Sequence, residues 1–361
     1  MMTQTISQQR TMQLEIATIA TSVPMGAQVY QEAVTSRAAE ALGSMSDVPW
    51  DVTRIIARSL RSELDGNRRI PVGALSHIGP TGRRVAGRLL YSRDALVHRM
   101  DLTLPPAPNE VLTIHDTVAW MYPDEGNPNP AVVDEIRRAT AVVCVSRNTA
   151  EDVFALTGRS DLRVVSPGVD ERFFSPRPLS AAERSQLGLP QRFILHAGGA
   201  SARKNLEGLA EAWRLVNREF PDVSLAMSGP QHARRDELFG DLPRVVRLGR
   251  IGSELVPGLL ASAEAVVVPS HYEGFGLPVI EAMAAGVPVI AARTSSLPEA
   301  AGDAAVLVET DGRSIAEGID CVLRGDSEVS DLREKGFRRA LHFTWGESVR
   351  NLAKVWSDAA S

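Results

Sequence analysis

The chain has 361 residues, of which 44% are hydrophobic and 23% are charged, and its formal net charge is −5. This length predicts two globular domains, and the negative balance argues against general binding of nucleic acid. No apolar run approaches the roughly 18–20 residues that cross a bilayer, and the first 20 residues lack the pattern of a signal peptide. We therefore expect a cytoplasmic protein. Two dispersed cysteines, Cys144 and Cys321, are expected to be small core residues.

Short apolar segments alternate with amphipathic ones, which is typical of βαβ units with parallel sheets. In the first half we predict strands over 13–20, 110–116, 141–146 and 162–167, and helices over 27–42, 129–139 and 147–157. In the second half we predict strands over 192–199, 223–229, 244–249, 265–270, 287–292 and 304–309, and helices near 203–219, 253–262 and 277–285. Between the halves, a polar stretch over 168–191 with three prolines is the best linker candidate.

This organisation predicts an α/β protein with two Rossmann-like, doubly wound domains that face each other across a cleft. We expect an N-terminal domain over 1–170, a linker over 171–191, and a C-terminal domain over 192–342. The remaining segment, 343–361, is expected to be a helix that packs back towards the N-terminal domain. Ligands of such sheets bind beyond the carboxyl ends of the strands.

Arginine is concentrated in one stretch of this acidic chain. Residues 51–99 contain ten arginines and four acids, so the net charge of the stretch is about +6. One interpretation is a solvated surface. The other is a face for an anionic partner, such as a membrane surface or a lipid diphosphate.

A glycine-rich turn stands in HYEGFGLPVIEAMAAGVPVI, residues 271–290, directly after a predicted strand. Its glycines allow the backbone to approach a ligand closely. Leu277–Pro278 fits a helix start, whose exposed N–H groups suit a phosphate. Gly286, before Val287–Pro288, fits the end of that helix.

Two carboxylates, Glu273 and Glu281, flank this turn and can accept hydrogen bonds from sugar hydroxyls. Together with the phosphate site, they predict a ligand with a phosphate centre and hydroxylated sugars, as in a nucleotide sugar. The alternative is a helix N-terminus that carries acids because of the helix dipole.

A basic pair, Arg203–Lys204, opens a predicted helix in GGASARKNLEGLAEAW, residues 198–213, in a chain with only three lysines. Departure of a nucleoside diphosphate builds negative charge that a metal or fixed cations must stabilise. The chain has no Asp-x-Asp sequence and its seven histidines are dispersed. We therefore favour the basic pair over a divalent ion and expect no metal and no cofactor. Alternatively, the pair lies on a solvated helix face.

These motifs resemble the retaining glycosyltransferases of the GT-B fold, family GT4. EGFGLPVIEAMAAGVPVI is similar to the family's E-x7-E signature, and GGASARKNLEGLAEAW to its diphosphate-binding segment. TIHDTVAWMYPDEGNP, preceded by LPPAP, resembles the His-Asp segment of mannosyl- and rhamnosyltransferase-like members. The resemblance covers most of residues 95–357 and is weak over 1–94.

By resemblance, the chain divides its site residues between catalysis and donor binding. The catalytic set is His115, Arg203, Lys204 and Glu273. The donor-binding set is Gly199, Gly249, Arg250, Ile251, Phe275, Gly276, Leu277 and Glu281. Glu273 corresponds to the glutamate that contacts the donor sugar, Glu281 to the one that holds the ribose, and Gly249–Ile251 to the contact with the base.

The N-terminal domain supplies the remaining sites in this resemblance. His115 is expected to bind the transferred sugar across the cleft, with Asp116 positioning it. The family's loop usually presents a glycine pair to the diphosphate, whereas SVPMGAQVY offers only Gly26.

The resemblance implies a metal-independent, retaining transfer from a nucleoside-diphosphate sugar. GDP-mannose, or a dTDP- or GDP-deoxysugar such as rhamnose, is the expected donor, and a glycan or polyprenyl-diphosphate-linked hydroxyl the expected acceptor. The 51–99 stretch adds a peripheral contact with the inner membrane face. The alternatives are a nucleotide-sugar epimerase of the same fold, a natural-product glycosyltransferase with a soluble acceptor, and a two-lobed sugar-binding protein. A dinucleotide dehydrogenase is disfavoured, because no G-x-G-x-x-G joins a strand to a helix.

Overall fold

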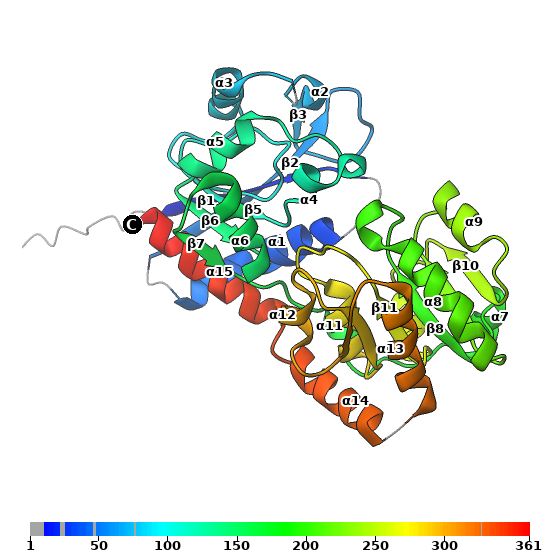
Figure 1. The fold of residues 1–361 in the computed structure, drawn as a ribbon. Coiled ribbons are helices and arrows are strands. Elements are labelled where there is room, and N and C mark those ends of the chain that lie inside the picture. Colours follow the sequence, from blue (N-terminus) through cyan, green and yellow to red (C-terminus); the bar gives the residue numbers. More distant parts are fainter. Residues whose placement is uncertain (1–10, 22–25, 46–47, 76, 326) are drawn as a thin grey trace, which may run out of the picture. The chain divides into compact units, whose positions relative to one another are not determined.

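The structure, a computed structural model, describes residues 11–21, 26–45, 48–75, 77–325 and 327–361. The chain forms two units (Figure 1). Unit 1 spans residues 1–117, 128–168 and 345–361, and unit 2 spans 118–127 and 169–344. This division differs from the expected ranges in two ways. Residues 118–127 group with the second unit, and the expected linker 171–191 is part of that unit.

Unit 1 is built on a seven-stranded parallel sheet in the order β3-β2-β1-β4-β5-β6-β7. The strands are β1 Met12–Ile19, β2 Trp50–Ser59, β3 Arg68–Ile70, β4 Leu96–Arg99, β5 Glu110–Ile114, β6 Ala141–Cys144 and β7 Leu162–Val164. The chain order reverses between β1 and β4, which makes this pair the switch point of a doubly wound sheet.

Three of these strands, β2, β3 and β4, were not predicted, and all lie in or next to the arginine-rich stretch. β2 carries Arg54 and Arg58 among its apolar residues, and β3 at the edge of the sheet begins with two consecutive arginines. In β4, His98 and Arg99 are fully buried, so polar side chains occupy positions that an apolar pattern would fill. The polar composition of these strands therefore explains why the apolar pattern did not predict them.

The helices of unit 1 connect these strands. They are α1 Gly26–Met45, α2 Val72–Leu75, α3 Pro80–Leu90, α5 Ala131–Arg138, α6 Arg147–Thr157 and α15 Trp345–Ala360. The C-terminal helix α15 packs against α1 and the sheet. Its Trp356 is fully buried and donates a hydrogen bond from Nε1 to His98 Nδ1 at 3.2 Å, which ties the last helix to β4.

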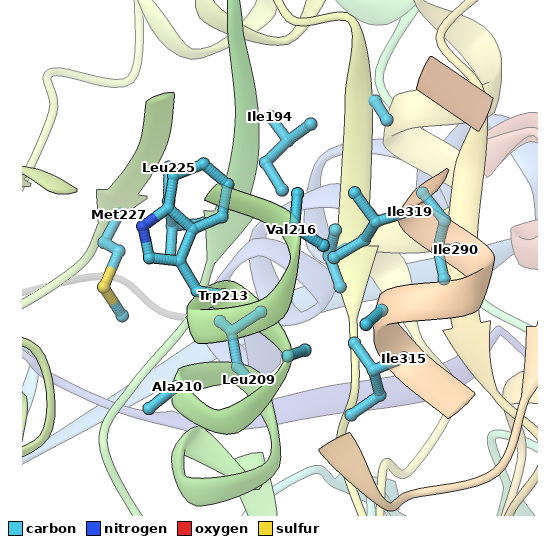
Figure 2. Packing of buried hydrophobic residues seen from close by; sticks show 14 of the residues in the cluster. Ile194, Leu209, Ala210, Trp213, Val216, Leu225, Met227, Ile290, Ile315 and Ile319 are labelled. Atoms are coloured by element: carbon cyan, nitrogen blue, oxygen red, sulfur yellow. The ribbon is translucent and has the colours of Figure 1, made fainter. Parts of the chain in front are cut away.

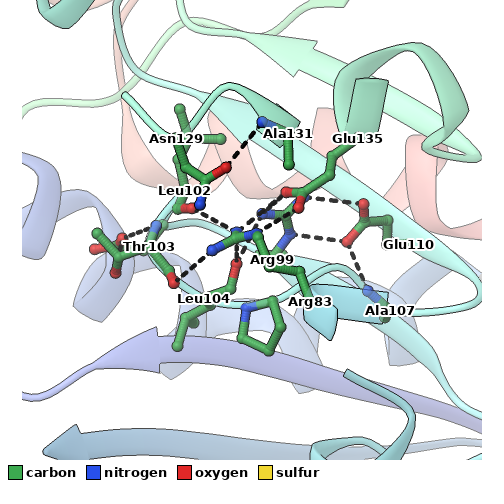
Figure 3. Close-up of polar contacts among 12 residues, drawn as sticks. Arg83, Arg99, Leu102, Thr103, Leu104, Ala107, Glu110, Asn129, Ala131 and Glu135 are labelled. Carbon is green, nitrogen blue, oxygen red and sulfur yellow. Dashed lines mark hydrogen bonds and ion pairs between the residues drawn. The ribbon is translucent and has the colours of Figure 1, made fainter. Parts of the chain in front are cut away.

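Two arginines of the basic stretch lie in the interior rather than on a surface (Figure 3). Arg83 binds Glu135 through Nε and Oε1 at 2.6 Å, and Arg99 binds Glu110 at 2.9 Å and Glu135 at 3.1 Å. Arg83 also donates to the carbonyl oxygens of Leu75, Leu102 and Leu104. A single cationic face made of all ten arginines is therefore wrong, because Arg83 and Arg99 neutralise buried carboxylates.

Unit 2 contains a six-stranded parallel sheet in the order β10-β9-β8-β11-β12-β13. Its strands are β8 Phe193–Ala197, β9 Ser224–Ser228, β10 Val245–Gly249, β11 Ala265–Val268, β12 Val289–Ala292 and β13 Val306–Val308. All six were predicted within two residues at each end. Long apolar runs mark strands that are buried on both faces, so their positions could be inferred from sequence.

Helical segments surround this second sheet. They are α4 Val118–Met121, η1 Pro123–Glu125, η2 Glu171–Phe173, α7 Ala181–Gln186, η3 Ala202–Lys204, α8 Leu206–Glu219, α9 Ala233–Phe239, α10 Val256–Ala261, α11 Leu277–Ala284, α12 Leu297–Ala301, α13 Gly312–Arg324 and α14 Ser327–Ala340. Within the described ranges, none of the chain's helices combines the length and apolar content needed to cross a membrane.

The core of unit 2 lies between helices α8 and α13 and one face of the sheet (Figure 2). Trp213 on α8 is fully buried and packs among Ile194, Leu225 and Ile319. Its indole Nε1 donates to Pro243 O at 2.9 Å, so its polar atom is also satisfied. Each large apolar side chain buried in this way contributes about 1.5–3 kcal/mol, which gives the site-bearing sheet a rigid support.

Replacing Arg83 tests the buried ion pairs of unit 1. In Arg83→Ser, Glu135 loses its bidentate partner and three carbonyl groups lose a donor, so we expect a loss of about 3–5 kcal/mol in the free energy of unfolding. The matched control is Arg84→Ser, which changes the exposed neighbour on the same helix and should cost less than about 0.5 kcal/mol. Denaturant unfolding measures both, and equal small losses would contradict a buried role for Arg83.

Candidate functional site

The site predicted in unit 2 lies at the carboxyl ends of β8 and β11, neighbouring strands at the switch point of the sheet. Residues 198–205 follow β8 and include η3, which carries Arg203 and Lys204. The glycine-rich turn follows β11 and leads into α11. Because parallel strands end on the same edge, two segments about 70 residues apart in sequence meet here. The His271 N–H donates to the Arg203 carbonyl at 2.7 Å and joins them directly.

Asn205 fixes the turn that presents the two cations. It adopts a left-handed backbone with φ 53° and begins α8, where its side chain accepts from the Gly208 N–H at 3.1 Å. Its Nδ2 donates to Pro269 O at 2.9 Å and Thr310 O at 2.7 Å. An asparagine tolerates this backbone better than most residues, so one side chain caps the helix and binds two further loops.

Glu273 binds both cations of the basic pair. Its Oε1 accepts hydrogen bonds from Lys204 Nζ at 2.6 Å and from Ser270 Oγ at 2.7 Å. Its Oε2 accepts from Arg203 Nη1 at 2.9 Å. Lys204 and Glu273 are buried, 9% and 7% exposed. The structure therefore brings together three of the four residues predicted to be catalytic.

The electrostatics of this cluster keep Glu273 ionised. Burial alone would raise the pKa of its carboxyl, but Lys204 and Arg203 and the hydrogen bonds lower the pKa to about 2. A carboxylate with this pKa accepts hydrogen bonds throughout the physiological pH range. It also holds both cations at fixed positions beside the strand ends, ready for a second anion.

The glycine-rich turn adopts the backbone that its sequence predicts. Gly276 has φ 100° and begins α11, with Leu277 and Pro278 in its first turn. A Cβ at position 276 would lie 3.0 Å from Leu297 Cδ2, so both space and backbone favour glycine there. In the described part of the chain, the N–H groups of Gly276 and Leu277 have no backbone acceptor. The buried Phe275 ring packs edge-on against Phe343, so only its backbone is available to a ligand.

The two remaining glycines that were predicted to bind the donor lie at the carboxyl ends of β8 and β10. Gly199 follows β8, and Gly249 ends β10 with φ 65° and accepts from the Gly229 N–H at 2.8 Å. Arg250 is exposed and Ile251 is partly buried in the loop after β10. These residues share the carboxyl edge of the sheet with Arg203, Lys204 and Glu273, here called the cation cluster. Among the described residues, no group of three or more histidine, cysteine or acidic side chains is arranged to hold a metal ion.

Glu281 lies on α11, partly buried and away from the cation pair that holds Glu273. Its burial raises the pKa of the carboxyl to about 7, with Asp170 raising it further and Arg172 opposing the shift. Both neighbours come from the segment that was expected to be a linker. The two glutamates thus have opposite environments, one fully ionised and one about half protonated at pH 7.

The predicted residues of unit 1 follow the carboxyl ends of strands in its own sheet. His115 directly follows β5, and its ring packs edge-on against Tyr30 at 4.8 Å between centroids. Burial lowers the pKa of His115, against the opposing effects of Asp116, Asp101 and the Met100 carbonyl, so the imidazole is neutral at pH 7. Its Nε2 has no hydrogen-bond partner among the described residues. Gly26 is the exposed first residue of α1, and the preceding loop residues 22–25 lie outside the described ranges.

Two acidic residues next to the cation pair were not predicted. Asp124 accepts from the Ala202 N–H through Oδ2 at 2.7 Å, and Glu125 accepts from Arg203 Nε at 2.6 Å. Both lie in the segment TIHDTVAWMYPDEGNP, in which the prediction concerned only His115 and Asp116. No spacing rule connects residues 124–125 with 202–203, so only the folded chain could reveal this contact.

The fold and this site geometry define a glycosyltransferase-type protein of two Rossmann-like units. A solved structure of Anabaena Alr3699/HepE in complex with UDP-glucose has a TM-score of 0.73 with 17% identity, and the match covers 96% of this chain and all of that one. Residues 180–339 match the family described as "Glycosyl transferases group 1".

Similar full-length proteins extend this match. O-antigen chain mannosyltransferase B of Escherichia coli is 30% identical over 287 residues, covering 73% of this chain and 74% of that protein. D-inositol 3-phosphate glycosyltransferase of Mycolicibacterium smegmatis is 30% identical over 371 residues, covering 98% and 83%. The chain belongs to the glycosyl transferases group 1, the GT4-type glycosyltransferases of the GT-B fold.

The raised pKa of Glu281 predicts a pH-dependent stability. The folded state retains this proton up to about pH 7, whereas an ordinary carboxyl of pKa 4.5 loses it earlier, so the wild type loses stability as the pH rises between these values. Glu281→Gln removes this effect. It should stabilise the protein by at most about 3 kcal/mol at pH 8, and by less at pH 5.5.

Thermal unfolding midpoints of the variant and wild type at both pH values measure this gain. Glu237→Gln, at an exposed position of the same unit, is the control and should shift the midpoint equally at both. A gain from Glu281→Gln that does not grow with pH would show that this carboxyl is not protonated in the folded protein.

Proposed function

We propose that this protein transfers a sugar from a nucleoside-diphosphate sugar to a hydroxyl of a glycan or lipid-linked acceptor, with retention of the anomeric configuration. The observation that carries the proposal is the cluster of Arg203, Lys204 and Glu273 at the switch point of unit 2. Two fixed cations beside a helix start are suited to a diphosphate, and the adjacent carboxylate is suited to sugar hydroxyls.

In this proposal the donor lies along the carboxyl edge of unit 2. Arg203, Lys204 and the N–H groups of Gly276 and Leu277 bind the diphosphate. Glu273 accepts hydrogen bonds from the sugar, and Glu281 from the ribose. The loops with Gly199 and with Gly249, Arg250 and Ile251 complete the contacts with the phosphate and the base.

The leaving diphosphate gains negative charge as the sugar bond breaks. We propose that Arg203 and Lys204 stabilise this charge and that transfer requires no metal. A leaving phosphate oxygen takes the proton of the acceptor hydroxyl as the hydroxyl attacks the same face of the sugar. The neutral His115 of unit 1 is proposed to bind a sugar hydroxyl through its ring.

The sugar and acceptor are proposed from the relatives. The similar protein of Escherichia coli is named an O-antigen chain mannosyltransferase, and the similar Anabaena structure holds UDP-glucose. We propose GDP-mannose, or a deoxysugar donor such as a dTDP- or GDP-linked rhamnose, and an acceptor that is a growing bacterial surface glycan. Proton NMR of the product tests retention through the anomeric coupling.

A membrane contact would bring the enzyme to a lipid-linked acceptor. Helix α3 presents Val85 and Leu89, which are 51% and 84% exposed, next to the exposed Arg84 and Arg88. The two arginines also line a cavity of about 230 Å³ together with Pro80, Pro106, Ala107, Pro108, Asp134, Glu135 and Arg138. Exposed apolar side chains beside cations suit an anionic lipid surface, so we propose α3 as the membrane contact.

Replacing Lys204 tests the proposed transfer. Lys204→Ala removes one of two cations from the leaving group, and we expect kcat to fall by at least about 100-fold. The control is Lys335→Ala, which changes an exposed lysine that forms a long ion pair of 4.0 Å with Asp303. Nucleoside diphosphate release, assayed with each candidate donor in the presence of a chelator, measures the rates. Full activity of Lys204→Ala would refute the role, and loss of wild-type turnover with the chelator would refute metal independence.

Sedimentation with vesicles tests the membrane contact. We expect binding to phosphatidylcholine vesicles that contain phosphatidylglycerol, and weaker binding at high salt. The variant Arg88→Ser/Leu89→Ser should bind at least about fivefold more weakly, because it loses one positive charge and one exposed apolar side chain that would insert between the lipids. Leu341→Ser, at another exposed leucine, is the control. Binding that neither salt nor the double substitution reduces would rule out α3 as the contact.

A further inference from the structure

Residues 118–127, here called the strap, belong to unit 2 although the chain on both sides belongs to unit 1. The strap contains α4 and η1, and its side chains contact residues in and next to the cation cluster. The ring of Tyr122 lies 6.4 Å from that of Tyr272 in the glycine-rich turn. Asp124 and Glu125 then reach the start of η3. The strap therefore contacts both segments of the proposed diphosphate site.

The strap binds this site through carboxylate oxygens. Glu125 forms an ion pair with Arg203 at 2.6 Å, and the two side chains are 22% and 16% exposed. Asp124 accepts from the backbone N–H of the adjacent Ala202. A guanidinium and a neighbouring N–H are also the donors that a phosphate group uses. Two carboxylates on consecutive residues thus occupy donors suited to the oxygens of a diphosphate.

The charges make simultaneous binding unfavourable. Arg203 already binds Glu273 through Nη1 and Glu125 through Nε, so its positive charge is compensated before any ligand arrives. A diphosphate at the same guanidinium would face the carboxylates of Asp124 and Glu125 at short range, where like charges repel each other. Glu273 is held by Lys204 and Ser270 as well, whereas within the described part of the chain the Glu125 carboxylate binds Arg203 alone.

We propose that Asp124 and Glu125 close the empty donor site and are exchanged for phosphate oxygens when the donor binds. The inference rests on the proposed function, because it takes the cations at 203 and 204 as the diphosphate site. Donor binding then breaks the strap's contacts with η3, and release of the nucleoside diphosphate restores them. The strap sets the affinity for donor and product by competing with both.

Calorimetric titration with inorganic pyrophosphate tests the exchange without knowledge of the base or sugar. Asp124→Asn/Glu125→Gln keeps the shape of the strap but removes its charges, so it should bind pyrophosphate about tenfold more tightly than the wild type. Glu264→Gln is the matched control. Its ion pair with Arg192 is also 2.6 Å long and partly exposed, but it precedes β11 at the opposite edge of the sheet. We expect no change in that variant.

The outcomes separate this proposal from the proposed function. If Lys204→Ala abolishes pyrophosphate binding and the strap variant binds no more tightly than the wild type, the diphosphate site stands and the exchange is refuted. If the strap variant and the wild type both fail to bind pyrophosphate, neither the exchange nor the site holds. Weaker binding by the strap variant would show that Glu125 only positions Arg203.

Amide hydrogen exchange gives a readout that a merely structural role would not change. Saturating pyrophosphate should increase exchange in peptides that contain residues 118–127 of the wild type, because the strap loses its contacts with Ala202 and Arg203. Exchange in peptides from α8 should stay constant or slow down. Protection of the strap by pyrophosphate would overturn the proposal.

Discussion

The pairing of Glu273 with Arg203 and Lys204 is the interaction on which the site depends. A buried carboxylate holds two cations from a different strand end, at 2.6 and 2.9 Å. Without it, two adjacent positive charges would repel each other in a poorly solvated pocket. With it, both cations keep fixed positions from which they can stabilise a further anion. The order of the strands makes this possible. The parallel strands β8 and β11 are neighbours because the strand order reverses at this point of the sheet.

The same physical constraint explains the interior of unit 1. Arg83 and Arg99 are fully buried and share Glu135, with Glu110 completing the network. Buried charges persist in proteins when they are paired and fully hydrogen-bonded. In unit 1 every partner comes from the interior of one fold, so the network is structural. In unit 2 the cluster lies at a ligand-binding edge, and one of its carboxylates arrives on the strap.

Two carboxylates of the strap accept hydrogen bonds from the proposed donor site before any substrate is present. Glu273 offsets one of the two positive charges of the basic pair, and Glu125 pairs with Arg203 to offset the other. Asp124 accepts a hydrogen bond from the adjacent Ala202 N–H. The same contacts would oppose a diphosphate that binds the same donors. Because the strap begins three residues after His115, the segment that closes the donor site and the proposed sugar-binding histidine are continuous in the chain.

The sequence by itself determined the family, the strands of the second sheet, the glycine-rich turn and the basic pair. Buried parallel strands are continuous apolar runs, and a helix start with glycines has a local pattern, so both are legible without a structure. Only the tertiary structure decided that Arg83 and Arg99 are internal, that β2 to β4 complete the first sheet, and that Glu125 binds Arg203. These depend on contacts between residues up to 82 positions apart, as in the pairing of β1 with β4. A charged residue also leaves the same local pattern in the sequence whether it faces water or a buried partner.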